Sequence, residues 1–162
     1  MRIINDTYSG RVEIYDDYVI KIFNEQALRE GLYRRELHWL KKLERYDRVP
    51  TVLDFGSNNI KMTYVGERIT KETLPVNWQK QIIEIYLEFQ KYECCHNDIK
   101  PEDILVLNDR LHIVDFGWAT TIFEEIPSHW DISIGAEFAL GPHDFDDYYS
   151  LNKSCEYIKS LE

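Results

Sequence analysis

The order of apolar and polar residues predicts short strands in the first part of the chain. Apolar positions alternate with polar ones over residues 3–23, which is typical of strands joined by tight turns. Two further apolar runs, 52–56 and 60–65, flank a polar turn at 57–59. We therefore expect a three-stranded meander followed by two more strands.

Two longer segments carry the spacing of an amphipathic helix. Apolar residues recur every three or four positions in 25–43 and again in 77–92. Asn77 is expected to cap the N-terminus of the second helix. The predicted apolar stripes are Leu28, Leu32, Leu40 and Leu43 in the first helix, and Trp78, Ile82, Ile85 and Phe89 in the second.

A β-hairpin is predicted after the second helix. The apolar runs 104–107 and 111–114 are separated by the turn residues Asn108 and Asp109. Asp103 precedes the first of these strands and Asp115 follows the second. The two carboxylates should therefore converge at the open end of one hairpin.

Residues 96–105 read H-N-D-I-K-P-E-D-I-L, and D-F-G follows at 115–117. This arrangement resembles the catalytic loop H-R-D-x-K-x-x-N and the D-F-G motif of the eukaryotic-like protein kinases. A second D-F-G at 54–56 has no such loop before it. A turn role for Asp98 alone is the simpler alternative, but no turn requirement fixes Lys100, Pro101 and Asp115 together.

The resemblance implies roles for four residues. Asp98 would accept the proton of the acceptor hydroxyl, and Lys100 would stabilise the transferred phosphoryl group. Asp103 and Asp115 would hold Mg²⁺ or Mn²⁺. Asp103 stands where the family has Asn, and Asn97 replaces the Arg of H-R-D, so we do not expect control by phosphorylation at Thr120 or Thr121.

The same resemblance implies a lysine–glutamate pair for the nucleotide phosphates. Lys21 lies in the run Y-V-I-K-I-F, which resembles the family's V-A-I-K strand. Glu36 falls on the apolar stripe of the first predicted helix, where a carboxylate needs a cation. The alternatives are surface pairing of Glu36 with Lys41, Arg35 or another exposed base, and Glu30 as the partner of Lys21.

The predicted ATP site takes its remaining residues from a lid and a hinge. Residues 5–12 read N-D-T-Y-S-G-R-V, which keeps only the last glycine, Gly10, and the valine, Val12, of the family's glycine-rich lid. Met62 would lie at the back of the adenine pocket, either as a ligand contact or as ordinary core. The backbone from Thr63 to Val65 would hydrogen-bond the base.

The implied fold is α+β and two-lobed, in a minimal form of the kinase domain. A single domain over 1–162 would have a β-rich N-lobe at about 1–66 and a shortened, mostly helical C-lobe at about 67–162. Residues 135–142 faintly resemble a substrate-binding loop without its A-P-E. Asp147 is expected either to accept backbone hydrogen bonds from the catalytic loop or to cap a helix, whose apolar stripe would be Tyr148, Leu151, Cys155 and Ile158.

Composition narrows the partners. With 19 basic and 29 acidic residues among 162, the net charge of −10 argues against a nucleic-acid partner. No apolar stretch approaches the length of a membrane span, so we expect a soluble cytoplasmic, or otherwise intracellular, protein without a membrane partner. The three cysteines, Cys94, Cys95 and Cys155, have no metal-ligand spacing.

Three functions remain open. The first is an ATP-dependent Ser/Thr protein kinase, favoured by Lys100 two residues after Asp98; its acceptor would be a protein, and a basic protein is one option. The second is a kinase acting on a small molecule. The third is a pseudokinase that binds partners without transfer, which Asp103 and the missing glycines favour.

Overall fold

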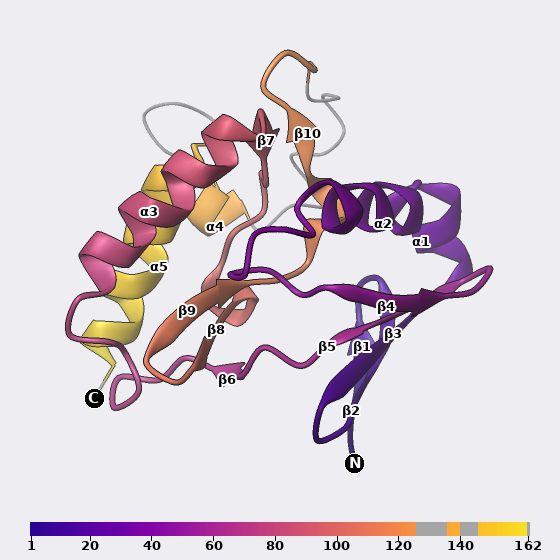
Figure 1. Ribbon diagram of the computed structural model, residues 1–162, viewed down its shortest axis with the longest axis horizontal. Helices are drawn as coiled ribbons and strands as arrows, with labels where there is room; N and C mark the ends of the chain where they lie inside the picture. The colour runs from indigo at the N-terminus through magenta and orange to yellow at the C-terminus, as the bar shows by residue number, and fades with distance from the viewer. Residues whose placement is uncertain (126–135, 140–145, 162) are drawn as a thin grey trace.

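The first five strands form one antiparallel sheet, in the order β1-β2-β3-β5-β4 (Figure 1). The computed structural model describes residues 1–125, 136–139 and 146–161. The sheet confirms the predicted meander and the two strands after it. Its strands are β1 Arg2–Thr7, β2 Gly10–Ile14, β3 Tyr18–Phe23, β4 Val52–Phe55 and β5 Asn59–Thr63.

The helix predicted over 25–43 is interrupted, and the single-helix prediction is wrong. The structure has α1 Glu25–Arg29 and α2 Leu32–Lys42, separated at Gly31, whose φ of 77° is left-handed. Glycine adopts this conformation without the steric cost that a side chain would bring. The predicted inward face survives the break, because Leu32, Glu36 and Leu40 are all buried.

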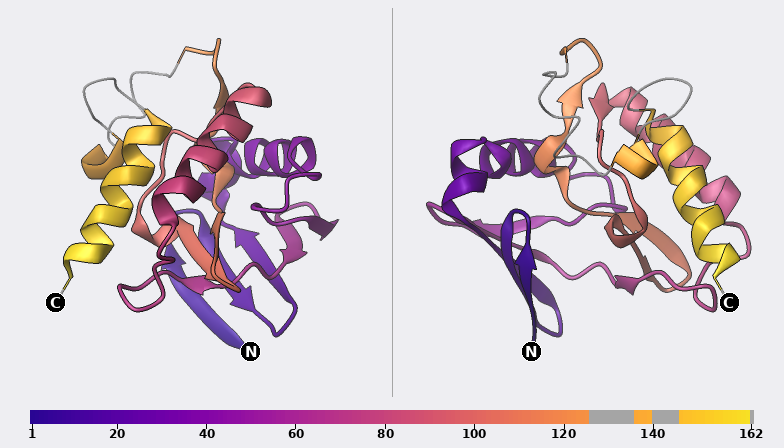
Figure 2. Two further views of the ribbon diagram at one scale, coloured as in Figure 1. Left: turned by 60° about the vertical axis from the view of Figure 1, so that its left-hand side comes forward. Right: turned by 180° about the vertical axis from the view of Figure 1, so that it is seen from behind.

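Two longer helices pack side by side in the second half of the chain, α3 Trp78–Lys91 and α5 Asp147–Ser160 (Figures 1 and 2). The predicted stripe of α3 is buried throughout. Asn77 makes no side-chain cap; its Oδ1 instead accepts from Gln81 Nε2 at 2.7 Å. On α5, Tyr148 is exposed, whereas Leu151, Cys155 and Ile158 are buried.

The predicted hairpin is present as β8 Ile104–Leu107 and β9 Arg110–Ile113. Asn108 and Asp109 both have positive φ, at 51° and 61°, as a tight two-residue hairpin turn requires. A short strand, β6 Glu67–Arg68, extends this sheet beside β8. Short 3₁₀ turns adjoin the hairpin: η1 Pro101–Asp103 before β8, and η2 Phe116–Trp118 after Asp115.

Sequence reasoning did not predict a second small sheet. β7 Cys94–Cys95 pairs antiparallel with β10 Thr120–Thr121, so the chain just before the predicted catalytic loop lies beside the chain just after D-F-G. Of the predicted loop at 135–142, residues 136–139 form α4 Ala136–Ala139, and the rest lies outside the described residues.

One cluster of buried apolar side chains runs through the described part of the chain. It includes Leu40 from α2, Phe89 from α3, Phe116 after the hairpin and Leu151 from α5. Contact through this cluster fixes the hairpin between the helices and the five-stranded sheet. Within the ranges described, no helix has the length and apolar character needed to cross a membrane.

Candidate functional site

A cavity of about 560 Å³ lies where the five-stranded sheet, α2 and the end of the β8–β9 hairpin meet. All the site residues predicted from sequence line it, with the exception of Gly10. They are Val12, Lys21, Glu36, Met62, Thr63, Val65, Asp98, Lys100, Asp103 and Asp115. The second D-F-G, at 54–56, lies on and just after β4 and does not line this cavity.

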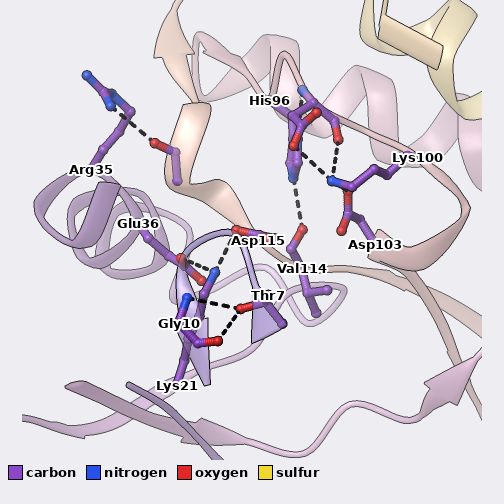
Figure 3. A network of polar contacts seen from close by, with 12 residues as sticks. Thr7, Gly10, Lys21, Arg35, Glu36, His96, Lys100, Asp103, Val114 and Asp115 are labelled. Carbon is purple, nitrogen blue, oxygen red and sulfur yellow. Dashed lines mark hydrogen bonds and ion pairs between the residues drawn. The ribbon is translucent and has the colours of Figure 1, made fainter. Parts of the chain in front are cut away.

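Lys21 joins two carboxylates that also line the cavity (Figure 3). Its Nζ lies 2.6 Å from Glu36 Oε2 and 2.6 Å from Asp115 Oδ1. The predicted pairing with Glu36 is therefore present, and the alternatives for Glu36, Lys41 and Arg35, are not its partners. The additional contact with Asp115 links the β3 lysine directly to D-F-G.

Burial and charge act in opposite directions on this triad. Burial disfavours the charge on Lys21, but Asp115 and Glu36 outweigh it and raise the lysine pKa. Burial raises the pKa of Glu36 to about 7, against the opposing effect of Lys21. For Asp115 burial is outweighed by Lys21 and Lys100, which hold its pKa well below the usual range. The neighbouring lysine charges therefore favour the carboxylate form of Asp115.

Lys100 joins the other two acids of the site. Its Nζ lies 2.8 Å from Asp98 Oδ2 and 2.8 Å from Asp103 Oδ2. Burial opposes the charge on Lys100, yet the two carboxylates raise its pKa. Burial also raises the pKa of Asp103 well above its ordinary value, partly offset by Lys100. One ammonium group thus contacts the predicted base and one predicted metal ligand together.

The hairpin brings Asp103 and Asp115 to the same place, as its predicted geometry requires. Ile104 pairs with Ile113, and the Val114 N–H donates to the Asp103 carbonyl at 3.1 Å. Asp115 follows in a left-handed conformation with φ of 69°. Such strain is uncommon for a residue with a side chain and is concentrated at functional sites.

The His96 ring connects the predicted catalytic loop to this hairpin through hydrogen bonds. The Asp98 N–H donates to His96 Nδ1 at 3.4 Å, so Nδ1 is the acceptor nitrogen of a neutral ring. Nε2 therefore carries the proton and donates to the Val114 carbonyl at 2.9 Å. Burial lowers the pKa of His96, which agrees with a neutral ring.

Asp147 holds the backbone of the predicted catalytic loop, as one of its two predicted roles requires. It is buried, and its two oxygens accept from the backbone N–H groups of His96 and Asn97, at 2.6 and 3.0 Å. Burial raises its pKa to about 7, although these hydrogen bonds favour the ionised form. The helix cap is its neighbour Asp146, whose Oδ1 accepts from the Tyr149 N–H.

The segment after Asp115 is held from two sides. From α2, Arg35 Nη1 donates to the Gly117 carbonyl at 3.1 Å, and Trp39 Nε1 donates to the Ala119 carbonyl at 3.0 Å. From the catalytic loop, Asn97 Nδ2 donates to the Trp118 carbonyl and to Thr120 Oγ1, both at 2.9 Å. The position of α2, and hence of Glu36, is therefore coupled to D-F-G.

Two predicted residues have structural roles that sequence reasoning did not foresee. Gly10 has φ of 139°, and a Cβ built on it would lie 2.1 Å from the Ile22 carbonyl oxygen, so close approach to β3 requires glycine there. Glu30, the alternative partner of Lys21, instead accepts from the Tyr8 hydroxyl at 2.9 Å. Glu30 is therefore not the partner of Lys21.

Several cavity residues were missed from sequence. Leu105 lies on β8, two residues after Asp103, so strand alternation could have placed it on the cavity side. Trp118 and Tyr8 also line the cavity, and their rings lie 6.1 Å apart. No periodicity marks these two, because their contact joins segments far apart in the chain.

The acids of the site suit a hard divalent cation. Mg²⁺ is commonly held by one or two carboxylates, with phosphate oxygens and water completing its shell. Asp103 and Asp115 provide two carboxylates on the same cavity. In the described ranges, no three His, Cys, Asp or Glu side chains gather into a metal site, so the remaining ligands would come from the nucleotide and water.

Comparison with known proteins agrees with this geometry at a coarse level. No protein-family model matches the chain. The Serine/threonine-protein kinase cds1 of Schizosaccharomyces pombe is 30% identical over 129 residues, which are 65% of this chain and 28% of that protein. The chain thus spans less than a third of this relative, and the match indicates a distant relationship to a kinase.

The solved structures add evidence on the fold. A crystal structure of monomeric WbdD superposes with a TM-score of 0.62 at 17% sequence identity. The match covers 94% of this chain and 48% of that one, so the chain spans about half of the solved structure. At this identity the likeness shows a shared mixed α+β fold.

Proposed function

We propose that this chain is an ATP-dependent phosphotransferase, and that it is a Ser/Thr protein kinase moving the γ-phosphate of ATP to a hydroxyl. One observation carries the proposal. Two lysine–carboxylate clusters, Lys21 with Glu36 and Asp115, and Lys100 with Asp98 and Asp103, line a single cavity. A site for nucleotide phosphates and a site for the acceptor hydroxyl are thereby adjacent.

In this proposal the nucleotide lies between the β1–β2 hairpin and the β8–β9 hairpin. Val12 covers the adenine, Met62 lies behind it, and the backbone of 63–65 holds its edge. Lys21 is placed for the phosphates because its charge is fixed by two carboxylates, one of which, Glu36, orients it from α2. The distant match to a kinase supports this placement at the level of function class.

Asp103 and Asp115 would hold Mg²⁺ or Mn²⁺ in this site. The ion would neutralise the negative charge that develops on the phosphate oxygens during transfer. Asp115 suits the role because its lowered pKa keeps it ionised. Asp103 provides a second hard oxygen donor where related loops have an amide.

Asp98 and Lys100 would act on the acceptor side. Asp98 accepts the proton of the attacking hydroxyl, within a loop that His96 and Asp147 hold from two directions. Lys100 Nζ lies 2.8 Å from both Asp98 and Asp103. Because its ammonium group is carried on a flexible stem, it can turn from Asp98 toward the transferred group. Its charge then stabilises the developing negative charge in a largely buried site.

We further propose that the activity needs no phosphorylation of the segment after D-F-G. The Thr120 side chain is only 1% exposed and its hydroxyl is bonded to Asn97. Asn97 replaces the arginine that would receive a phosphate, and it already holds the segment in place. Because residues 117–120 are held by hydrogen bonds without a modification, the proposed activity is constitutive.

A nucleotide-binding module without transfer is the second candidate. The observation that favours it is the Thr7 hydroxyl, which accepts from the Gly10 N–H and so occupies a backbone donor of the lid. A kinase acting on a small molecule differs from the main proposal only in its acceptor. Lys100 favours the protein acceptor, since small-molecule kinases often carry another residue at that position.

The three functions are separated by binding followed by an acceptor screen. Calorimetry of ATP binding, with and without Mg²⁺, is expected to show metal-dependent affinity. Incubation with a basic protein and with a panel of small hydroxyl compounds, followed by mass spectrometry, then identifies the acceptor. Phosphorylated protein supports the proposal, phosphorylated small compounds support the second kinase class, and binding without any transfer supports the module.

A further inference from the structure

The turn between β1 and β2 is fastened by side chains on both of its sides. Inside the turn, Thr7 Oγ1 donates to the Gly10 carbonyl at 2.7 Å and accepts from the Gly10 N–H at 3.1 Å (Figure 3). Behind it, Asn24 Nδ2 donates to the Tyr8 carbonyl at 3.0 Å, and the Asn24 N–H donates to the Ser9 carbonyl at 2.9 Å. Residues 7–10 are thus held by more than the strand ladder.

Tyr8, at the tip of the turn, reaches two other parts of the chain. Its hydroxyl lies 2.9 Å from both carboxylate oxygens of Glu30, at the end of α1. Gln26 Nε2 donates to the same hydroxyl at 3.0 Å and to Glu30 Oε1 at 3.0 Å. The centroid of the Tyr8 ring lies 6.1 Å from the centroid of the Trp118 ring, and Trp118 directly follows D-F-G.

We propose that Tyr8, held by Glu30, is a positioning residue that keeps the β1–β2 turn closed over the cavity before nucleotide binds. This inference rests on the proposed nucleotide site. Thr7, Tyr8 and Ser9 line the cavity, so the place of the turn sets how phosphates are covered.

A turn held by side-chain hydrogen bonds should bind nucleotide differently from a glycine-rich lid. Glycines leave a lid free to move, and the entropy of ordering it is lost when nucleotide binds. A turn that is already ordered has lost that entropy in advance. The expected result is slow release of bound nucleotide.

The fastening also connects the lid to the Lys21 triad. Glu30 ends α1, and α2 follows directly with Glu36 on its buried face. Trp118 follows Asp115 by three residues, and its carbonyl is held by Asn97. Glu30 and Trp118, which contact Tyr8 in the turn, are thus close in the chain to Glu36 and Asp115 of the Lys21 triad.

Amide hydrogen exchange in the nucleotide-free protein tests the fastening itself. The reporters are the amides of Gly10 and Asn24, which bond within the turn or to it. In Tyr8→Phe and Glu30→Ala we expect about fivefold faster exchange, as for the loss of one such hydrogen bond. Glu30→Gln, whose amide oxygen still accepts, should exchange like the wild type.

Two controls sharpen this test. Tyr15→Phe removes a hydroxyl bonded to Glu13 on the same hairpin, away from its tip, and should change neither reporter. The double variant Tyr8→Phe with Glu30→Ala should exchange no faster than Tyr8→Phe alone, because that variant already removes the contacts of the Tyr8 hydroxyl with Glu30 and Gln26. Unchanged exchange in Tyr8→Phe, or multiplied effects in the double variant, would overturn the proposed fastening.

Release of a fluorescent ADP derivative tests the positioning role separately. Tyr8→Phe should release it about fivefold faster than the wild type and Tyr15→Phe. Faster exchange at the reporters with unchanged release would overturn the positioning role and leave the nucleotide site standing. A wild-type protein that binds no nucleotide would overturn both the positioning role and the proposed function, whereas hydrogen exchange would still report on the turn.

Discussion

Four of the acids that line the cavity, Glu36, Asp98, Asp103 and Asp115, contact a lysine, and these contacts suggest different tasks. Asp98 contacts Lys100 in the catalytic loop, whereas Asp115 contacts Lys21 on the sheet. Asp98 therefore belongs to the acceptor side of the proposed reaction and Asp115 to the nucleotide side. Substitution of each should affect different measurements.

Asp98→Asn should lower the transfer rate by a factor of about 10² to 10⁴, the contribution of a positioned base. Its ATP affinity should stay near that of the wild type. Asp115→Asn should weaken metal-dependent ATP binding as well as transfer. Calorimetry with Mg²⁺ and a rate assay separate the two variants.

A matched control exists within the chain, because D-F-G occurs twice. Asp54→Asn changes the first residue of the copy on β4, which lies outside the cavity, and should leave ATP affinity unchanged. Loss of ATP affinity in Asp98→Asn equal to that in Asp115→Asn would contradict the division of roles.

Two adjacent acids at the start of α5 give a second residue-scale prediction. Asp147→Asn replaces one accepting oxygen by an NH₂ group facing a backbone N–H, so it should lower the free energy of unfolding by roughly 2 kcal/mol. Asp146→Asn keeps a good helix cap and should change stability little. Denaturant unfolding of both variants measures the difference in their free energy of unfolding. An equal loss of stability in the two variants would contradict a specific contribution from the hydrogen bonds that Asp147 accepts.

Glu36 gives the site a pH dependence. Burial raises its pKa to about 7 in the folded chain, above the ordinary value of 4.5. Between these values the folded state binds more protons than the unfolded state, so this contribution to stability falls as pH rises from about 4.5 to 7. Glu36→Gln should remove this part of the pH dependence of the free energy of unfolding between pH 4.5 and 7. An unchanged pH dependence would mean that other groups cause it.

Sequence reasoning predicted most of these residues from the resemblance of 96–105 and 115–117 to kinase motifs. Glu36 was placed by helix periodicity, since a carboxylate on an apolar face needs a cation. The contact between Lys21 and Asp115 was not predicted, because no local pattern relates residues 94 positions apart. Tyr8 was missed for the same reason.

At the scale of elements, local patterns predicted what elements exist more reliably than where they stop. The strands over 3–23 and the hairpin at 104–114 follow from alternation and turn residues. The break at Gly31 was missed, because the apolar stripe continues through it with one helical register. The pairing of β7 with β10 was also missed, since two-residue strands carry no periodicity.

That pairing supports a prediction about the segment after D-F-G. Removal of phosphate by a phosphatase should leave the transfer rate unchanged, because Thr120 is bonded to Asn97 without modification. Thr120→Glu would bury an unpaired charge and should abolish activity, whereas Thr121→Glu, at a more exposed position, should have a smaller effect. A rise in activity in Thr120→Glu would contradict the constitutive form.

At the scale of the whole molecule, the five-stranded sheet and the β8–β9 hairpin both contribute residues to the cavity. A ligand that contacts both should stabilise the folded chain as a whole. With ATP and Mg²⁺ at a hundred times the dissociation constant, the expected gain is about 2.7 kcal/mol. Thermal unfolding with ATP alone, Mg²⁺ alone and both together measures it; equal midpoints in all conditions would contradict a metal-dependent nucleotide site.

The likeness to WbdD shows which part of the account concerns fold alone. It covers 94% of the chain at 17% identity, so the arrangement of elements is shared while most side chains differ. A fold of this kind supports more than one chemistry. The account of function therefore depends on the residues at the cavity, and above all on Asp98.

The most direct test is transfer of labelled γ-phosphate from ATP, with Mg²⁺ and separately with Mn²⁺, to the protein itself and to a basic protein. Wild type and Asp98→Asn are compared at equal ATP occupancy. We expect transfer by the wild type and its loss in the variant. Equal transfer by both would contradict the assignment of Asp98 as the base, and metal-dependent ATP binding without transfer to either acceptor would contradict the proposed protein kinase.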